Sequence, residues 1–209
     1  MIGNVFNPEK MYTYLRGYAS GAGMKETLKA LSFAREKHKG QFRKSGEPYI
    51  IHPLMMACNA VSIGIREDSV VATILLHDVC EDCDIRVSEL PVNDTIKQAV
   101  SLMTFHVMEG ETKEIAKNRY YNMLLHSREA TLTKLLDRCH NVSSMAGTFS
   151  VEKLESYIEE TRQYVLTLLR RAKDAFPEDS NEFFVLKYHI VSVIDSIEAA
   201  MAVYEQKEN

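Results

Sequence analysis

A short acidic segment, Leu75 to Asp82, contains the residues of this chain best suited to chemistry. It places one histidine and three carboxylates within six consecutive residues, directly after an apolar run that begins at Val70. These residues are His77, Asp78, Glu81 and Asp82. In an α-helix, where each residue advances about 100° around the axis, they would share an arc of roughly 140° and could face one cavity. Three acids beside an apolar segment are costly unless a cation or a functional pocket compensates them, although a solvated helix face would also cluster acids.

Two residues far from this segment offer further metal-binding groups. His52 stands at the predicted start of a helix, and Asp137 lies in a helical pattern with Lys134 three residues before it. Taken singly, His52 fits an ordinary core or surface histidine, and Asp137 fits a helix acid that is salt-bridged to Lys134. Together with His77 and Asp78, they present two imidazoles and two carboxylates from three helices. Such a mixed nitrogen and oxygen set suits a divalent first-row metal ion such as Mn²⁺, Fe²⁺, Co²⁺ or Zn²⁺.

Apolar periodicity, interrupted by glycine and proline, predicts helices along the whole chain. The predicted helices cover residues 7–18, 25–39, 52–64, 94–105, 113–125, 129–145, 151–175 and 181–205, with a further helix that starts at about residue 67 and includes the acidic segment. A polar loop over residues 41–48 separates the second helix from the third. The chain has no sustained strand-like alternation, no repeat and no low-complexity linker. We therefore expect an all-α fold, with a single helical-bundle domain over residues 1–209.

Composition excludes several classes of function. The chain has 209 residues with 45% hydrophobic content, enough for a continuous core, and its formal net charge of −4 provides no basic field for nucleic-acid binding. No apolar segment reaches the ~18 to 20 residues that span a bilayer, and the N-terminus lacks the apolar region of a signal peptide. A single C-x-x-C pair, Cys80 and Cys83, is a weak signal for zinc or redox chemistry. We expect reduced thiols and a cytoplasmic protein without nucleic-acid or membrane partners.

Three stretches resemble a known family. The order His52, His77-Asp78 and Asp137 is that of the HD-domain phosphohydrolase superfamily. The stretches are His38–Pro53, Leu75–Asp82 and Lys134–Asn141, and they closely resemble motifs in the hydrolase domain of RelA/SpoT-type alarmone enzymes. The similarity covers residues 25–175, with a C-terminal helix at about 181–205 beyond it. Because the chain leaves no room for a synthetase domain, it is similar to the small stand-alone alarmone hydrolases.

The resemblance implies a manganese-dependent hydrolase that removes the 3′-pyrophosphate of (p)ppGpp and leaves GDP or GTP, with Mn²⁺ replaceable by another divalent first-row ion. The implied metal ligands are His52, His77, Asp78 and Asp137. The implied pair that positions and activates the attacking water is Glu81 and Asp82. The implied substrate-binding residues are Arg43, Lys44 and Ser45 against the nucleotide base, Asn141 near the ribose, and Ser144 in place of a threonine hydroxyl. The partner would be a small nucleotide, and the helices from Val151 onward offer pairing surfaces for an oligomer.

Departures from the family pattern leave the substrate open. Ser143 stands where the third motif usually has arginine, and Cys83 stands where threonine usually follows the acidic pair. The alternatives are hydrolysis of another nucleotide, such as ppApp, the 2′-phosphate of NADPH or a 5′-monophosphate, and a non-catalytic alarmone-binding module. Arg138 and His140 lie inside the third motif, where they are candidates to orient the metal site or to contact phosphate.

Overall fold

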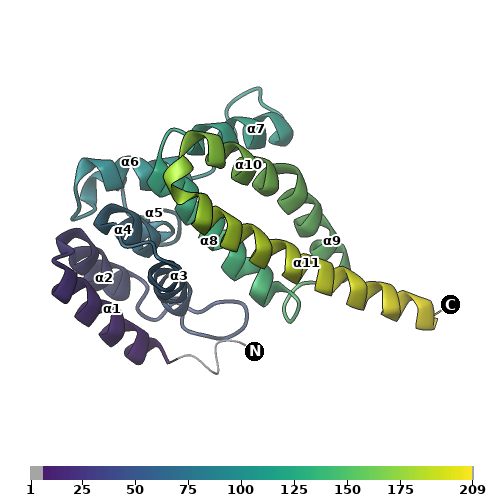
Figure 1. Ribbon diagram of the computed structural model, residues 1–209, viewed down its shortest axis with the longest axis horizontal. Helices are drawn as coiled ribbons and strands as arrows, with labels where there is room; N and C mark the ends of the chain where they lie inside the picture. The colour runs from purple at the N-terminus through teal and green to yellow at the C-terminus, as the bar shows by residue number, and fades with distance from the viewer. Residues whose placement is uncertain (1–6, 209) are drawn as a thin grey trace.

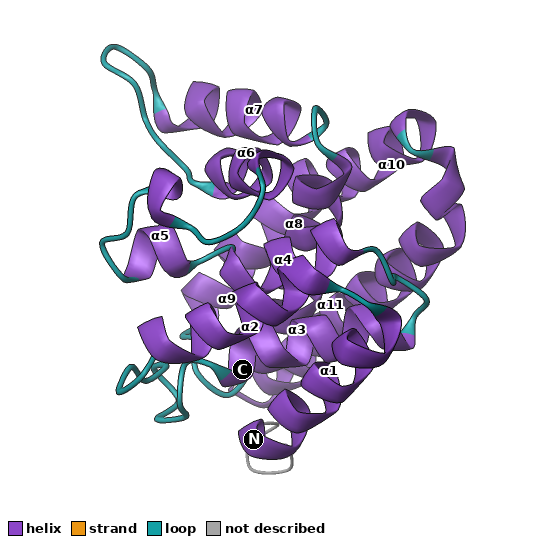
Figure 2. Ribbon diagram, turned by 90° about the vertical axis from the view of Figure 1, so that its left-hand side faces the viewer, coloured by secondary structure: helices purple, strands orange, loops and turns teal. Residues whose placement is uncertain are grey.

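The described part of the chain is built from helices. The computed structural model describes the backbone of residues 7–208 and the side chains of residues 7–204, so residues 1–6 and 209 of the predicted domain lie outside the described residues. Within residues 7–208 no β-strand forms, and an isolated antiparallel bridge pairs Phe42 with Pro48 (Figures 1 and 2). The predicted all-α fold is confirmed.

The helices follow the predicted ranges closely. The α-helices are α1 (Pro8–Ala22), α2 (Lys25–Lys37), α3 (Ile51–Ser62), α4 (Asp68–Leu76), α5 (Val79–Asp82), α6 (Asp94–Met103), α7 (Lys113–Leu124), α8 (Arg128–Met145), α9 (Val151–Glu160), α10 (Leu166–Ala175) and α11 (Ser180–Glu208). Two short 3-10 turns are η2 (Val87–Glu89) and η4 (Pro177–Asp179), and a π-helical segment, η3 (Thr161–Val165), joins α9 to α10. The single helix predicted over residues 151–175 is therefore interrupted by one π-helical turn.

Local polar residues explain where several helices begin. A polar residue stands directly before each of α6, α7, α8 and α9, and its side chain accepts a hydrogen bond from the backbone N–H three residues later. In this order, the residues are Asn93, Thr112, Ser127 and Ser150. Such caps satisfy N–H groups that have no partner inside the helix, and each typically contributes about 1 kcal/mol. These starts are therefore encoded locally in the sequence.

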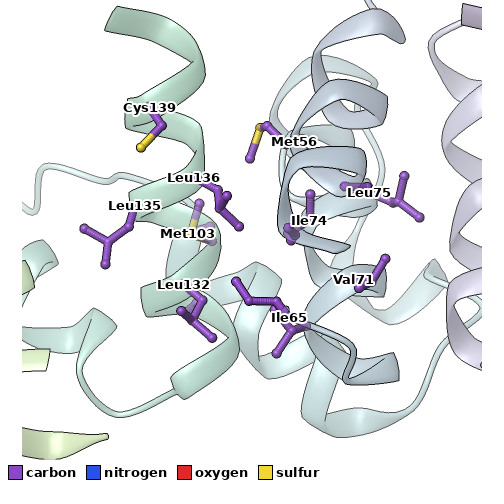
Figure 3. Packing of buried hydrophobic residues seen from close by; sticks show 14 of the residues in the cluster. Met56, Ile65, Val71, Ile74, Leu75, Met103, Leu132, Leu135, Leu136 and Cys139 are labelled. Carbon is purple, nitrogen blue, oxygen red and sulfur yellow. The ribbon is translucent and has the colours of Figure 1, made fainter. Parts of the chain in front are cut away.

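Helix α4 lies at the centre of the molecule. It packs against α2, α3, α6 and α8, and every residue from Val70 to Leu76 is buried. In Figure 3, buried side chains of α8, including Leu132 and Leu136, face those of α3 and α4, including Met56 and Ile74. A helix that is buried on all sides has a continuous apolar sequence rather than a striped one. Each fully buried Leu or Ile contributes about 1.5–3 kcal/mol, so this packing fixes α3, α4 and α8 relative to one another.

The continuous helix predicted through the acidic segment is wrong. Helix α4 ends at Leu76, His77 and Asp78 form a turn, and α5 begins at the next residue. The ring nitrogen Nδ1 of His77 lies 2.8 Å from the carbonyl oxygen of Ile74. In a continuous helix that oxygen would accept the N–H of Asp78, so the histidine ring competes for the same acceptor. The acidic segment is therefore bent immediately after the core helix.

The C-terminal helices cover α8. Helix α11 packs against α8 and α10, and Figure 1 shows its C-terminal end extending beyond the other helices. Among residues 7–208, no helix combines the length and the apolar composition of a membrane span.

Candidate metal centre

The four predicted metal ligands come from the three helices at the centre of the core. His52 lies near the start of α3, His77 and Asp78 form the turn after α4, and Asp137 lies in the middle of α8. These helices pack against one another in pairs. Only 2% of His52, 3% of His77 and 8% of Asp137 is exposed. The core packing therefore determines where these polar groups lie.

The nitrogen and oxygen atoms of these four residues converge. His52 Nε2 lies 3.3 Å from His77 Nε2, 3.5 Å from Asp78 Oδ2 and 3.4 Å from Asp137 Oδ1. His77 Nε2 lies 3.0 Å from Asp78 Oδ2. The ligand atoms of His52, His77 and Asp78 all lie within 4.8 Å of one another, and Asp137 joins them through His52. We call these four residues the ligand cluster.

The ligand cluster favours a positive charge at its centre. Because His77 Nδ1 bonds the carbonyl of Ile74, the lone pair of the neutral ring is on Nε2, which faces the other ligands. Burial lowers the pKa of His77, but the carboxylates of Asp78 and Asp137 outweigh this effect and raise that pKa to about 9. Burial lowers the pKa of His52. Two imidazole nitrogens and two carboxylate oxygens are a donor set that a divalent first-row metal ion binds.

Neighbouring side chains hold the two carboxylates in place. Asp137 Oδ2 accepts a hydrogen bond from Lys134 Nζ at 3.1 Å, and its Oδ1 accepts one from Asn141 Nδ2 at 2.6 Å. Burial raises the pKa of Asp137, but the charge of Lys134 and the nearby histidines hold it well below its ordinary value. The Tyr49 hydroxyl donates to Asp78 Oδ2 at 2.6 Å. Sequence reasoning predicted the Lys134 pair but missed Tyr49, whose only signal was its place in the first motif.

A cavity of about 700 Å³ adjoins the ligand cluster. His52, Asp78 and Asp137 form part of its wall, whereas His77 is not part of the lining. All five predicted substrate-binding residues line it, namely Arg43, Lys44, Ser45, Asn141 and Ser144. Its apolar lining consists of Phe42, Met55, Met145 and Phe149. The volume is that of a typical small-molecule site, and the mixture of cations and aromatic side chains suits a phosphorylated ligand with a flat apolar part.

The loop that carries Arg43 is folded against α8. Its backbone closes tightly, since the N–H of Arg43 donates to the carbonyl of Glu47 at 2.8 Å and the N–H of Gly46 donates back to Arg43 at 2.9 Å. Gly46 has a φ of +85°, a conformation that glycine adopts readily. Arg43 Nη2 donates to Asn141 Oδ1 at 3.1 Å, while the buried Nη1 has no partner among the described residues. Arg43 therefore lines the cavity with Nη2 bonded to Asn141 and Nη1 enclosed.

The predicted water-activating pair lies outside the cavity lining. Glu81 and Asp82 are exposed on α5, and neither belongs to the cavity lining. Glu81 Oε1 accepts a hydrogen bond from the backbone N–H of Phe105 at 3.0 Å. Partial desolvation raises the pKa of Glu81, and the nearby charge of Asp78 adds to that effect. The predicted shared face of the four acidic-segment residues is therefore wrong, because Glu81 and Asp82 neighbour the cluster without facing the cavity.

His140 links the ligand cluster to the cavity wall. Its Nδ1 lies 2.9 Å from Nδ1 of His52, and its ring lines the cavity. Burial, followed by the nearby His52 and Arg43, lowers the pKa of His140 to about 3, so the ring is neutral.

The two serines that depart from the family motif bond to backbone carbonyls of α8, and Ser143 also contacts α11. Ser143 Oγ donates to the carbonyl of Cys139 at 2.8 Å and lies 2.7 Å from His189 Nε2. Ser144 Oγ donates to the carbonyl of His140 at 3.2 Å. Both residues line the cavity without adding a charge to it.

Comparisons with known proteins agree with this geometry. The chain is 34% identical over 181 residues to a guanosine-3′,5′-bis(diphosphate) 3′-pyrophosphohydrolase of Aquifex aeolicus, an alignment that covers 81% of this chain and 24% of the relative. It is 27% identical over 176 residues to the bifunctional (p)ppGpp synthase/hydrolase SpoT of Escherichia coli, covering 78% of this chain and 24% of the relative. The chain thus spans about a quarter of the length of these curated relatives. The resemblance to RelA/SpoT-type enzymes is confirmed.

A solved structure shares the fold. It is described as a metazoan ortholog of SpoT that hydrolyzes ppGpp, and it matches with a TM-score of 0.63 at 21% identity, over 82% of this chain and 95% of that one. The family described as HD domain matches residues 30–163, which include every member of the ligand cluster. Because the match covers more than half of the chain, the chain belongs to the HD-domain family.

Proposed function

We propose that the chain is a metal-dependent phosphohydrolase that removes the 3′-pyrophosphate of the guanosine alarmones (p)ppGpp and leaves GDP or GTP. One observation carries this proposal: the ligand cluster lies at the wall of a cavity of about 700 Å³ that also contains Arg43 and Lys44. Membership of the HD-domain family supports the class of chemistry. The names of the A. aeolicus and E. coli relatives support the choice of substrate.

The ligand cluster would hold the metal ion, which we propose to be Mn²⁺. A bound divalent ion lowers the pKa of a coordinated water and polarises phosphoryl oxygens. Tyr49 and Lys134 keep the carboxylates of Asp78 and Asp137 oriented and ionised. The backbone carbonyl of Ile74 fixes His77 in the tautomer that presents Nε2.

The cavity wall provides groups for each part of the nucleotide. Arg43 and Lys44 bring positive charge to a chain that is acidic overall, and charged donors of this kind bind phosphate strongly. Phe42 and Phe149 offer apolar faces for a base. Asn141 bonds both Asp137 and Arg43, so it fixes the distance between the ligand cluster and the loop that would hold the nucleotide.

In the proposed reaction, water attacks the phosphorus that is attached to the 3′ oxygen. The bond between that phosphorus and the 3′ oxygen breaks, pyrophosphate leaves, and the 3′ oxygen takes up a proton. We assign removal of the water's proton to Glu81, with Asp82 positioning the water. The raised pKa of Glu81 brings its basicity closer to neutral pH, where general bases work best. To act, Glu81 must release the N–H of Phe105 and turn toward the cluster.

A second candidate is hydrolysis of a different nucleotide. Ser143 adds no charge to the cavity wall, and its hydroxyl bonds to Cys139 and His189. A wall without the cation that the related motif has there could accept a substrate with a different base or phosphate arrangement. The candidates are ppApp, the 2′-phosphate of NADPH and a 5′-monophosphate.

A nucleotide panel tests the proposal. The purified protein is loaded with Mn²⁺ and incubated separately with ppGpp, ppApp, NADPH and dAMP, while pyrophosphate and phosphate are measured. We expect pyrophosphate from ppGpp, and none after a chelator has removed the metal. Phosphate from NADPH or dAMP, or pyrophosphate from ppApp alone, would reassign the substrate. No release from any of the four would instead indicate a non-catalytic binding module.

A further inference from the structure

The contact between His52 and His140 constrains where both rings carry their protons. The two Nδ1 atoms lie 2.9 Å apart, and the ring centroids lie 4.6 Å apart with the planes inclined at 62°. A neutral imidazole has one N–H donor and one bare nitrogen acceptor. One of these Nδ1 atoms must therefore donate and the other must accept.

The ligand cluster determines which ring donates. Nε2 of His52 is the atom that faces His77, Asp78 and Asp137, so it is the atom available to a metal ion. A neutral histidine that binds metal through Nε2 carries its proton on Nδ1. In the metal-loaded protein, His52 Nδ1–H therefore donates to His140 Nδ1, and the proton of His140 must be on Nε2.

Nε2 of His140 is accessible from the cavity. The His140 ring lines the cavity next to the ligand cluster, together with Arg43 and Asn141. No described residue forms a hydrogen bond with this Nε2, and it is not among the buried atoms that lack a partner. An N–H donor at this place, close to Arg43, matches a phosphate oxygen of a bound nucleotide.

We propose that His140 has two separable roles: Nδ1 positions the metal ligand His52, and Nε2–H binds a phosphate oxygen of the substrate. This proposal rests on the proposed function, since it takes His52 Nε2 as a metal ligand. It goes further because it fixes the tautomers of both rings. It also makes His140 the residue through which substrate binding and metal binding are connected.

Two substitutions separate the roles. In His140→Asn, the amide oxygen replaces Nδ1 and can still accept from His52, but no donor reaches the cavity. In His140→Gln, the longer amide places a donor near the position of Nε2 and leaves the Nδ1–H of His52 without its acceptor. The matched controls are His106→Asn and His106→Gln, because His106 is exposed on the loop before α7.

The expected results differ between the variants. His140→Asn should keep Mn²⁺ affinity by calorimetry and lose about 10- to 100-fold in kcat/KM for ppGpp, the loss expected for a hydrogen bond to a charged group. His140→Gln should bind Mn²⁺ about 10- to 100-fold more weakly and keep most of kcat/KM when the metal is saturating. If both His140 variants melt at the wild-type temperature but show any other combination of Mn²⁺ affinity and kcat/KM, the assignment of the two roles is wrong.

A measurement on the unmodified protein makes the test independent of folding. In the Zn²⁺-loaded protein, which is diamagnetic, proton–nitrogen correlation spectra of the histidine rings should show protons on His52 Nδ1 and His140 Nε2. A proton on His140 Nδ1 would overturn this proposal alone, provided that the protein binds Mn²⁺ and hydrolyses ppGpp. Failure of the wild type to bind any divalent ion would remove the proposed function, and this proposal with it.

Discussion

The acidic pair on α5 follows the ligands His77 and Asp78 within a few residues, yet the ligand cluster and the acidic pair are held very differently. His52, His77 and Asp137 are almost completely buried in the core, Asp137 is held by Lys134 and Asn141, and His77 is held by the carbonyl of Ile74. Glu81 and Asp82 are exposed on a four-residue helix, where Glu81 has a single backbone partner at Phe105.

The difference indicates two kinds of functional residue in one site. Metal ligands must keep a fixed geometry, which is best provided by buried, hydrogen-bonded side chains on rigid elements. A group that takes up and releases a proton must instead reach solvent or substrate, and a short exposed helix permits that movement. We therefore expect substitutions in the cluster to abolish metal binding, and substitutions on α5 to change turnover alone.

The largest effect is expected for Asp78→Ala. This change removes a carboxylate whose Oδ2 lies near both ligand histidines. Stoichiometric Mn²⁺ binding, measured by calorimetry, should be lost together with hydrolysis of ppGpp. Glu155→Ala, at an exposed position of α9, is the matched control and should bind the metal normally. Stoichiometric metal in Asp78→Ala would show that the ligand assignment is wrong.

Glu81→Gln should reduce turnover and leave metal binding unchanged. The amide keeps the size of the side chain but cannot take up the proton of the attacking water. We expect wild-type Mn²⁺ binding and a kcat that falls by about 10²- to 10⁴-fold. Glu155→Gln serves as the control. Unchanged turnover would exclude Glu81 from the mechanism and leave Asp82 as the acid to test.

Tyr49→Phe should weaken Mn²⁺ binding by the ligand cluster without removing a metal ligand. Burial and the nearby charge of Asp78 raise the pKa of the Tyr49 hydroxyl far above its ordinary value, so it remains a donor to Asp78. Loss of this bond should reduce Mn²⁺ affinity by about 10- to 100-fold. The control is Tyr188→Phe on α11, where the side chain is 70% exposed. Equal Mn²⁺ affinities for Tyr49→Phe and the wild type would show that Asp78 needs no such support.

The smallest effect is expected from a change of a single pH unit. Burial lowers the pKa of His77, but the two carboxylates raise it to about 9, so the metal-free ring is protonated at neutral pH. Metal binding must displace this proton, and Mn²⁺ affinity should rise by up to about tenfold per pH unit until it levels near pH 9. Calorimetry in buffers of different ionisation enthalpy should detect about one proton released. An affinity that does not change between about pH 6 and 9 would contradict this account of His77.

The sequence predicted the cluster better than its surroundings. The order of His52, His77-Asp78 and Asp137, with apolar helical patterns around them, was enough to nominate four ligands that converge in the folded chain. The Lys134–Asp137 pair was predicted because a spacing of three residues makes side chains on one helix neighbours. Such features depend on local periodicity and on helices that the core brings together.

The side-chain contacts around the ligand cluster were not predicted. The turn at His77 arises because its ring bonds the carbonyl of Ile74, and the position of Glu81 depends on a backbone N–H near the end of α6. The bond from Tyr49 to Asp78 and the contact between His52 and His140 join residues 29 and 88 positions apart. No spacing rule along the chain reveals contacts of this kind.

The position of a bound metal ion tests the central claim most directly. Crystals of the protein grown with Mn²⁺ would give an anomalous difference map that shows the ion itself. We predict one strong peak at about 2.0–2.3 Å from His52 Nε2, His77 Nε2, Asp78 Oδ2 and Asp137 Oδ1. A peak at another site, or a fully occupied ion that leaves out His52 or Asp137, would contradict the claim.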